Sequence, residues 1–397
     1  MDTLFVLIAT IVIIIVLLVL KRPVYIVLAI AIFLASLIYG GPSFLISSAT
    51  RALLDPDTWT LTLSIFAVAS LAMLYGTTGI AARMGNEFSK CVRNETLALS
   101  LAPGIMGLLP IPGGALMSAP IVDAIGDRLG LSRSKKSFAN VWYEHIIVPI
   151  YPLDPMIMVA SAISGFSIPS IIAKLFPMIV IMYLIGLPLI GVRRSKIQEK
   201  ADYLGLSKAL LPILLAAVIA LSTLSLDQLL GVSRVSIVIA IFIAFIVFKN
   251  LNGVDIKTIL KCLRDRRVWE ITVLILELAV FGEMILSMDM SQVVPYLASI
   301  KELILIGLPM LLAALGGHPA IGVIVAMPIA LQVGGFSLST ACMVYFSAFI
   351  SYLISPLHLC LVYTIRYFNA SLKDSYRYLV PTAIALLVAS YVVLLML

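Results

Sequence analysis

The sequence has few charged residues and no long polar segment. Asp, Glu, Lys and Arg make up only 12% of the 397 residues, whereas 62% are hydrophobic and the mean hydropathy is +1.14. Uninterrupted apolar stretches such as residues 5–20 favour membrane helices over the alternating pattern of a transmembrane β-barrel. The composition therefore predicts an all-α polytopic membrane protein.

Signatures of enzymes are also missing. There is no G-x-x-x-x-G-K-[ST] phosphate loop and no soluble segment large enough to hold one, so ATP hydrolysis is not expected. An intramembrane hydrolase would need a Ser–His site, a paired-Asp site or a His-Glu-x-x-His motif. The nearest candidate, Glu144-His145, has no second ligand on the same helix face. We therefore predict a protein that is not an enzyme and has no resident cofactor.

Cysteine and histidine are rare and widely separated. The four cysteines are Cys91, Cys262, Cys342 and Cys360. They have no spacing typical of metal sites, and we interpret them as small apolar residues or reduced thiols. The three histidines include no close pair in the sequence, so no metal site is predicted.

Ten apolar windows are long enough to cross a bilayer. They lie at residues 4–20, 23–40, 59–82, 138–163, 168–192, 207–225, 232–249, 269–288, 338–365 and 378–397. Two further stretches, about 97–126 and 302–335, are interrupted by Pro, which removes a backbone donor, and by Gly, which destabilises a helix. Each is predicted to be a re-entrant hairpin that enters and leaves on one side. The first window has almost no charge before it and no cleavage site after it, so we expect a retained helix.

The positions of Lys and Arg indicate the orientation. In the ten-crossing layout all of them fall on one side except Arg51, Arg234 and Lys301, which fall on the other, and Lys174, which lies within a helix. The positive-inside rule makes the basic side cytoplasmic, so both termini are predicted to be extracellular. The first hairpin then opens from the cytoplasm and the second from outside. The net charge of +7 reflects this asymmetry and does not predict a nucleic-acid partner.

The two interrupted stretches share a sequence pattern. Residues 108–120 and 316–328 align with an offset of 208 residues, which sets Pro120 on Pro328. Outside the hairpins, Trp59 and Trp269 begin counterpart helices, and two Pro-Leu dipeptides precede a polar residue at matching positions. Gly/Pro-interrupted segments at corresponding places in two halves are the best sequence indication of a transporter's binding site.

These matches predict an inverted repeat. Each half has one hairpin and five crossings, and an odd number of crossings inverts the second half relative to the first. The repeats are predicted at residues 1–200, with the hairpin at about 97–126, and at residues 201–397, with the hairpin at about 302–335. Scaffold and transport domains would each be drawn from both repeats.

Two motifs resemble a known family. Leu-Pro-Ile-Pro-Gly-Gly-Ala-Leu-Met-Ser-Ala-Pro at residues 109–120 and Trp-Tyr-Glu-His at residues 142–145 resemble domain-of-unknown-function family 401. The whole layout resembles the ion transporter superfamily, which includes gluconate permeases, dicarboxylate/sodium symporters and citrate/metal symporters. The resemblance implies two opposed hairpins whose tips meet a substrate near the midplane, and an unwound stretch in the helix after each hairpin. It also implies a scaffold that forms a homodimer and elevator-type movement.

The chain departs from the dicarboxylate branch at the hairpin tips. That branch carries a Ser-Asn-Thr signature for sodium and carboxylate, whereas the tips here are Pro-Ile-Pro-Gly-Gly at residues 110–114 and Gly-Gly-His-Pro-Ala at residues 316–320. The coupling ion is therefore left open between H⁺ and Na⁺.

The hairpin tips are the predicted substrate site. Helix N-termini there expose N–H groups and the positive end of the helix dipole, which favour an anion, and glycine lets backbone approach a ligand closely. Alternatively, the glycines only permit tight helix packing, and Ser118 only hydrogen-bonds to backbone. The candidate substrate-binding residues are Pro112, Gly113, Gly114, Ser118, Gly316, Gly317, His318 and Pro319.

Ionisable residues in apolar surroundings are the candidates for coupling, because they are costly at membrane depth. Asp154 and His358 each follow Pro-Leu at a predicted helix break, where unwound carbonyls can coordinate a cation or a proton donor. The alternatives are that Asp154 caps a helix near an interface, that the glutamates are paired internally, and that the histidines are hydrogen-bonded core residues. The coupling candidates are Asp154, His358, His145, Glu144, Glu277 and Glu283.

Together these features predict a multi-pass secondary active transporter of the plasma membrane. It would carry a small anionic organic solute as a proton- or sodium-coupled symporter, by an elevator mechanism. The alternative is a cation/proton antiporter that uses Glu277, Glu283 and Asp154. The expected partners are the solute, the lipid bilayer and a second copy of the chain.

Overall fold

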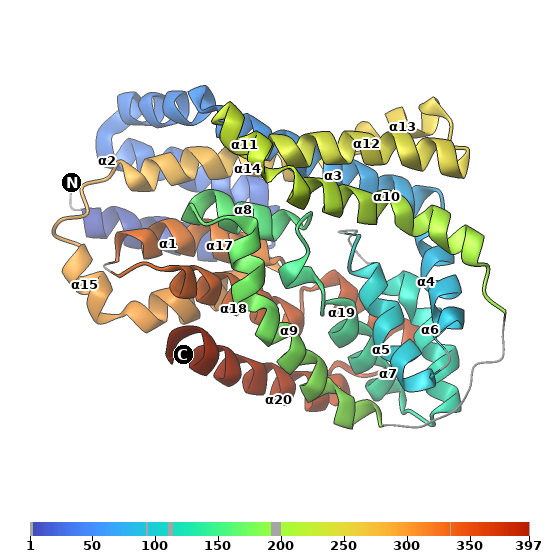
Figure 1. Ribbon diagram of the computed structural model, residues 1–397. Helices are drawn as coiled ribbons and strands as arrows, with labels where there is room; N and C mark the ends of the chain where they lie inside the picture. Colours follow the sequence, from blue (N-terminus) through green and yellow to red (C-terminus); the bar gives the residue numbers. More distant parts are fainter. Residues whose placement is uncertain (1–2, 93, 110–113, 192–199, 334, 397) are drawn as a thin grey trace.

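All regular structure in the described part of the chain is helical (Figure 1). The computed structural model describes residues 3–92, 94–109, 114–191, 200–333 and 335–396. Helices of the first half are α1 (Thr3–Val19), α2 (Val24–Leu54), α3 (Pro56–Thr77), α4 (Ile80–Cys91), α5 (Glu95–Met106), α6 (Ala115–Arg128), α7 (Arg133–Glu144), η1 (Val148–Ile150), α8 (Pro155–Ser164) and α9 (Ile168–Ile190). Helices of the second half are α10 (Tyr203–Ser222), α11 (Leu224–Leu230), α12 (Val235–Asn252), α13 (Ile256–Leu263), α14 (Arg266–Leu286), α15 (Val294–Ser299), η2 (Leu303–Gly307), α16 (Leu308–Gly316), α17 (Pro319–Gln332), α18 (Leu338–Ile354), α19 (Leu359–Phe368), α20 (Leu372–Tyr391) and η3 (Val392–Met396).

Among the described residues, eight helical stretches are long and apolar enough to cross a membrane, which is compatible with a multi-pass membrane protein. They are Val24–Leu54, Pro56–Thr77, Arg133–Ser164, Ile168–Ile190, Tyr203–Ser222, Val235–Asn252, Leu338–Tyr367 and Leu372–Met396. The other two predicted crossings coincide with α1, which has only 17 residues, and with α14, which carries Glu270, Glu277 and Glu283. Each of the ten predicted windows therefore contains helical structure, and the windows at 138–163 and 338–365 also contain a non-helical interruption.

The two interrupted stretches each form a pair of short helices that pack against each other. Helices α5 and α6 have 12 and 14 residues, and α16 and α17 have 9 and 14. At about 1.5 Å per residue the longest of them measures about 21 Å, less than the ~30 Å hydrocarbon core of a bilayer. Each pair thus has the dimensions of a half-length hairpin. Gly114 directly precedes α6, whereas the predicted site residues Pro112 and Gly113 lie outside the described residues.

The helix after each hairpin is interrupted. Residues 145–154 separate α7 from α8, with only the short η1 between them, and residues 355–358 separate α18 from α19. Proline explains both interruptions, because Pro152 and Pro356 have no backbone N–H and disfavour helical backbone in the residue before them. We call residues 145–154 the first break and residues 355–358 the second break.

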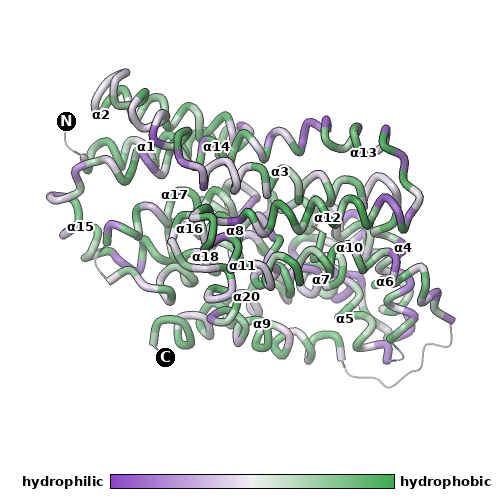
Figure 2. Tube along the Cα trace, turned by 45° about the horizontal axis from the view of Figure 1, so that its top comes forward, coloured by the Kyte–Doolittle hydropathy of each residue, from purple (hydrophilic) through white to green (hydrophobic). Residues whose placement is uncertain are grey.

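The hairpins and broken helices form a core that extends from α17 and α18, on the side of the N-terminus, to α5, α6 and α7 at the other end of the molecule (Figure 1). Helix α17 packs against α8, and α6 packs against α19, so each hairpin contacts the broken helix of the other half. Helices α17 and α18 are buried along most of their length. Long helices α2, α3, α10, α12 and α14 make contacts with one another and lie to one side of this core, and α9 and α20 lie to the other (Figures 1 and 2).

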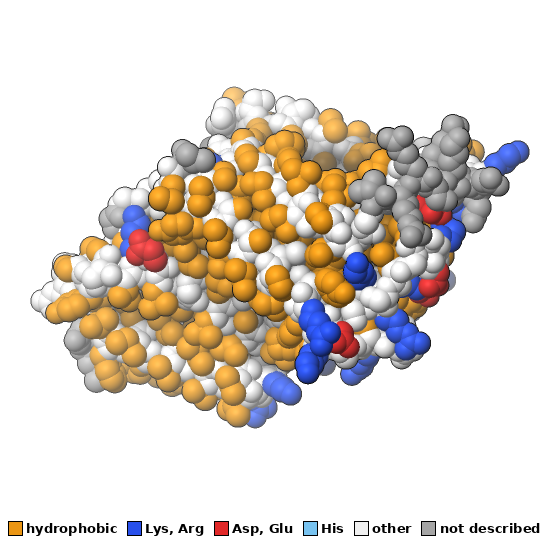
Figure 3. Space-filling view, turned by 90° about the horizontal axis from the view of Figure 1, so that it is seen from below, with side chains coloured by type: hydrophobic (Ala, Val, Ile, Leu, Met, Phe, Trp, Pro, Cys, Tyr) orange, Lys and Arg blue, Asp and Glu red, His pale blue; other side chains and the backbone are white. Residues whose placement is uncertain are grey.

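The two ends of the molecule differ in charge. Both termini lie toward one end, whereas α4, α6 and α13 lie at the opposite end (Figures 1 and 2). On the face in Figure 3, hydrophobic side chains cover a broad area, and most of the visible Lys and Arg side chains gather toward one end. A broad apolar face with basic side chains toward one end is the surface expected of a protein that crosses a bilayer.

Candidate functional site

Ionisable side chains from the two breaks meet in the core. His145 directly follows α7 and His358 directly precedes α19, and their ring centroids are 4.8 Å apart. The ring of Tyr352, near the end of α18, lies 3.8 Å from that of His358 and 5.6 Å from that of His145. Glu144 and Cys360 complete the group, because the Cys360 thiol donates a 3.9 Å hydrogen bond to Glu144 Oε1. We call these five residues the central cluster.

Several polar atoms of the central cluster are buried without a hydrogen bond. The His358 side chain has no exposed surface, and Glu144 is only 4% exposed. Within the described ranges, neither ring nitrogen of His358 nor Oε2 of Glu144 has a hydrogen-bond partner. An unsatisfied buried polar group costs roughly 1–3 kcal/mol, so such groups in a native fold call for a ligand, an ion, a water molecule or a proton.

His145 is held more firmly than His358. Its Nδ1 lies 2.8 Å from the carbonyl oxygen of Val141 one turn earlier. Because a carbonyl only accepts, Nδ1 must carry the proton, and in the neutral ring Nε2 then carries the lone pair. Glu144 Oε2 lies 3.7 Å from the same Nδ1, too far for a second hydrogen bond.

The tip of the second hairpin reaches the edge of the central cluster. The ring of His318 lies 6.1 Å from that of Tyr352. His318 also caps α17, because its Nδ1 accepts a 3.1 Å hydrogen bond from the amide of Ala320. Pro319 is buried at the first position of α17, where a helix needs no N–H donor.

Glycines let both hairpins approach the breaks closely. Gly317 ends α16 with a φ of +60°, and a Cβ built there would lie 2.8 Å from the carbonyl oxygen of Leu357 in the second break. A Cβ on Gly316 would lie 2.6 Å from a side-chain carbon of α17. In the first hairpin, a Cβ on Gly107 would overlap the carbonyl oxygen of Glu144. These glycines therefore serve close packing, and contact of Gly316 and Gly317 with a solute stays a prediction.

Ser118 belongs to a buried network at the first hairpin. Its hydroxyl lies 2.8 Å from Oδ1 of Asn140 and 3.2 Å from the carbonyl oxygen of Ala115. Nδ2 of Asn140 donates a 2.9 Å hydrogen bond to the same Ala115 carbonyl and another of 2.9 Å to Oγ1 of Thr364. The network joins α6, α7 and α19, so Ser118 has a side-chain partner as well as the backbone contact expected of it.

Asp154 ends the first break and caps α8. Its Oδ1 accepts a 2.8 Å hydrogen bond from the amide of Met156, and the residue is only 6% exposed. His358 occupies the equivalent position before α19 but makes no capping hydrogen bond with its side chain. Asp154 is therefore a helix cap within the core of the protein.

The two candidate glutamates of α14 lie outside the central cluster. Glu283 forms a 3.2 Å ion pair with Arg51. It therefore has the partner expected if this glutamate is paired internally rather than used for coupling. Oε2 of Glu277 is buried, and no residue of the described ranges gives it a hydrogen bond.

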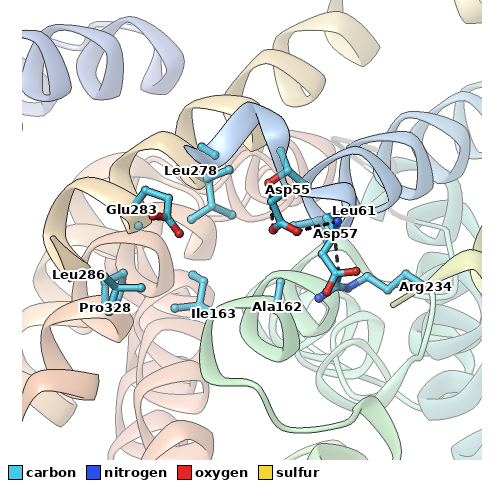
Figure 4. A pocket seen from close by; sticks show the side chains of 14 residues that line it. Asp55, Asp57, Leu61, Ala162, Ile163, Arg234, Leu278, Glu283, Leu286 and Pro328 are labelled. Atoms are coloured by element: carbon cyan, nitrogen blue, oxygen red, sulfur yellow. Dashed lines mark hydrogen bonds between the residues drawn. The ribbon is translucent and has the colours of Figure 1, made fainter. Parts of the chain in front are cut away.

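A cavity of about 170 Å³ lies where α14 and the start of α3 meet α8 and α17. Figure 4 shows Glu283 across this cavity from Asp57 and Arg234. The carboxylate of Asp57 accepts hydrogen bonds of 2.7 and 2.8 Å from the amide and hydroxyl of Ser233. Asp57 is half-buried, and its carboxylate ties the first turn of α3 to the residues before α12.

The family model described as Protein of unknown function (DUF401) matches residues 3–397. The chain belongs to this family. No curated protein matches the chain. The DUF401 match agrees with the resemblance seen at residues 109–120 and 142–145, and it covers both hairpins, both breaks and the central cluster.

In this DUF401 chain the structure brings only some of the predicted coupling residues together. Glu144, His145 and His358 meet, and His318 stands at the edge of their cluster. Asp154 makes its side-chain hydrogen bond to the start of α8 rather than to the cluster, and Glu277 and Glu283 lie on α14, outside it.

Sequence reasoning missed four further residues, namely Asn140, Tyr352, Cys360 and Thr364. Asn140 carried a usable signal, because an amide inside an apolar window needs a partner. The other three look like ordinary helix residues until the fold places them beside the breaks.

Proposed function

We propose that this protein is a secondary active transporter of a small anionic organic solute. The observation that carries the proposal is the meeting of two half-length hairpins and two broken helices around a buried polar cluster. Non-helical backbone at membrane depth is tolerated only where protein or a water-filled cavity surrounds it. Discontinuous helices at matching places in two halves are the usual way in which transporters build a site near the midplane.

The hairpin tips support an anionic solute. Helices α6 and α17 begin at the two tips, and a helix N-terminus carries the equivalent of about +0.5 charge together with N–H donors. The described residues of both tips include no Lys or Arg. The solute is therefore expected to be small and weakly charged, and to depend on backbone N–H groups rather than on a cationic side chain.

The breaks support coupling to an ion. Glu144 Oε2 and both nitrogens of His358 lack hydrogen-bond partners among the described residues. The Glu144 carboxylate and the one unprotonated nitrogen of a neutral His358 ring can each take up a proton or a cation. A proton on Glu144 would convert an acceptor into a donor. We assign the coupling step, with H⁺ or Na⁺, to Glu144, His145, Asp154 and His358.

Local structure supports the inverted repeat on which an elevator movement depends. Asp55 caps α3 and Asp265 caps α14. Each carboxylate accepts a hydrogen bond from the backbone amide two residues later, at 3.0 Å in α3 and 2.9 Å in α14. The indole N–H groups of Trp59 and Trp269 each donate a hydrogen bond to the backbone carbonyl six residues earlier, with distances of 2.8 Å and 3.1 Å. Two helices from different halves thus begin in the same way, as repeats of one ancestral unit would.

The outer helices support the division into two moving parts. In the proposal, α2, α3, α10, α12 and α14 form the scaffold, and the hairpins with the broken helices carry the solute. Exposed apolar side chains of α10 and α12, such as Val218 and Phe242, would face lipid or a second copy of the chain. The basic end with α4, α6 and α13 would be cytoplasmic, which leaves both termini extracellular (Figure 1).

One observation favours the alternative function, a cation/proton antiporter. Glu277 has a buried carboxylate oxygen without a hydrogen-bond partner in the described ranges, and the cavity of Figure 4 is lined by Asp55, Asp57 and Glu283. The buried carboxylate oxygen of Glu277 suits exchange of a cation for a proton, whereas the carboxylates that line the cavity are half-buried or exposed. The antiporter would therefore use a different site from the symporter, formed by α14 and the start of α3.

Solute counterflow in proteoliposomes separates the two functions. Vesicles loaded with an unlabelled small organic acid are diluted into trace labelled acid, without any ion gradient, and a panel of such acids is compared with protein-free vesicles. A carrier accumulates label transiently, and we expect this for at least one weakly charged carboxylate. The antiporter would instead be favoured if vesicles with an acidic interior release protons when Na⁺ or K⁺ is added outside, and if no organic acid shows counterflow.

A further inference from the structure

The central cluster has the composition of a metal site as well as of a proton site. The ligand atoms of His145, His358 and Cys360 all lie within 4.8 Å of one another, and all three residues are buried. Glu144 adds a carboxylate to this group, because its Oε1 accepts a 3.9 Å hydrogen bond from Cys360 Sγ. Two imidazoles, a thiol and a carboxylate thus converge from the end of α7 and the start of α19.

The separation of these atoms is close to that of a coordinated set. Bonds of about 2.0–2.3 Å to a tetrahedral zinc ion place the ligand atoms roughly 3.3–3.8 Å apart. The observed spread of 4.8 Å exceeds this by about 1.0–1.5 Å at most, so the ligand side chains must move together by that amount to coordinate one ion.

One ligand is already oriented for coordination. His145 donates its Nδ1 proton to the Val141 carbonyl, which leaves the Nε2 lone pair available. A metal-binding histidine typically has this second contact, because it fixes the tautomer and the ring.

Unsatisfied atoms at the same place point to a ligand. His358 is fully buried, and neither of its nitrogens has a hydrogen-bond partner in the described part of the chain. The same holds for Oε2 of Glu144. A cation bound between these side chains would satisfy one His358 nitrogen and the carboxylate at once.

We propose that His145, His358 and Cys360, with Glu144 as the fourth ligand, bind one divalent cation of the zinc class. Imidazole and thiolate are borderline-soft donors that prefer Zn²⁺ or Co²⁺ to Mg²⁺ or Ca²⁺. The bound ion joins α7 to α19 and so links the two breaks. Coordination requires deprotonated ligands, so metal and protons compete for the same side chains.

The inference concerns residues that the proposed function also uses, but it does not rest on that function. Metal binding is an equilibrium property of the purified protein and needs neither a solute nor a gradient. Failure of the metal experiment leaves the transport proposal standing, and a negative transport assay leaves the metal site standing.

Cobalt titration of the purified full-length protein in detergent tests the site. The protein is kept reduced, stripped with a chelator and titrated with Co²⁺ as a spectroscopic substitute for Zn²⁺. Wild-type protein is expected to bind one equivalent and to show a thiolate-to-cobalt charge-transfer band together with the visible bands of four-coordinate cobalt. Cys360→Ser should lose the charge-transfer band and bind at least about 10-fold more weakly, in line with the loss of a ligand.

Two variants serve as matched controls. Cys342→Ser removes another buried thiol, from α18, and should keep the full cobalt spectrum. His318→Gln removes the histidine at the edge of the cluster and should also keep it, whereas His358→Gln should lose tight binding. A cobalt band that survives Cys360→Ser, or that disappears in Cys342→Ser, overturns the assignment.

A measurement on wild-type protein alone covers the case in which a variant does not fold. X-ray absorption of the zinc-loaded protein should show one sulfur neighbour at about 2.3 Å beside nitrogen and oxygen neighbours. A shell of nitrogen and oxygen only, or no retained zinc at an equimolar amount, overturns the proposal.

Discussion

Replacing Gly317 with alanine tests whether the second hairpin must touch the second break. Gly317 has a φ of +60°, a backbone conformation that costs other L-residues about 1–2 kcal/mol. The added Cβ would also lie 2.8 Å from both the Cβ and the carbonyl oxygen of Leu357, so the tip or the break must move. With an overpacking cost of ~1–3 kcal/mol, we expect the free energy of unfolding to fall by roughly 2–5 kcal/mol.

Gly282→Ala is the matched control. Gly282 lies within α14, and a Cβ there would meet no heavy atom within 4 Å. Alanine is favoured over glycine in a helix interior by about 1 kcal/mol, so this variant should be as stable as wild type or more so. Thermal unfolding in detergent measures both variants, and counterflow measures their transport.

We expect Gly317→Ala to unfold at a lower temperature than wild type and to exchange solute more slowly. If it unfolds and transports like Gly282→Ala, the close approach of the tip to the second break is not needed. The geometry on which the proposed site depends would then be wrong.

Three further predictions concern topology, coupling and the buried network. A cysteine introduced at Ser134 should resist an impermeant thiol reagent applied to intact cells, and rapid labelling from outside would contradict a cytoplasmic position for the start of α7. Asp154→Asn and His358→Gln should uncouple solute accumulation from an imposed pH gradient while counterflow persists; if both still concentrate solute, their role is structural and Glu277 becomes the better candidate. Asn140→Ala should lower the free energy of unfolding by about 1–3 kcal/mol, because the hydroxyls of Ser118 and Thr364 lose their shared partner; unchanged thermal unfolding would show that water replaces the amide without cost.

Local composition was enough to predict most of the secondary structure. Long apolar windows without strand-like alternation give helices because a helix satisfies its own backbone hydrogen bonds in lipid, and all ten windows contain helices among the described residues. The breaks were predictable for a similarly local reason, since Pro152 and Pro356 cannot continue a helix. The close approach of Gly317 to Leu357 was not, because a glycine that turns a chain and a glycine that faces a ligand look alike in sequence.

The central cluster shows where sequence reasoning stops. Glu144 and His145 stood out as ionisable residues in apolar surroundings, and His358 stood out beside a proline. Cys360 and Tyr352 did not, because each is an ordinary residue of a membrane helix until tertiary packing brings it beside the others. Ligand spacing within the sequence indicates metal sites only when the ligands lie on one segment, whereas these side chains come from helices more than 200 residues apart.

Uphill accumulation of solute tests the central claim most directly. Proteoliposomes containing the wild-type protein are given an inward proton gradient or an inward sodium gradient, and uptake of the acid identified by counterflow is followed over time. A secondary active transporter should raise the internal concentration above the external one under at least one gradient, and dissipating that gradient with an ionophore should abolish the excess. Equilibration without accumulation under either gradient would contradict coupled transport and reduce the protein to a passive pathway.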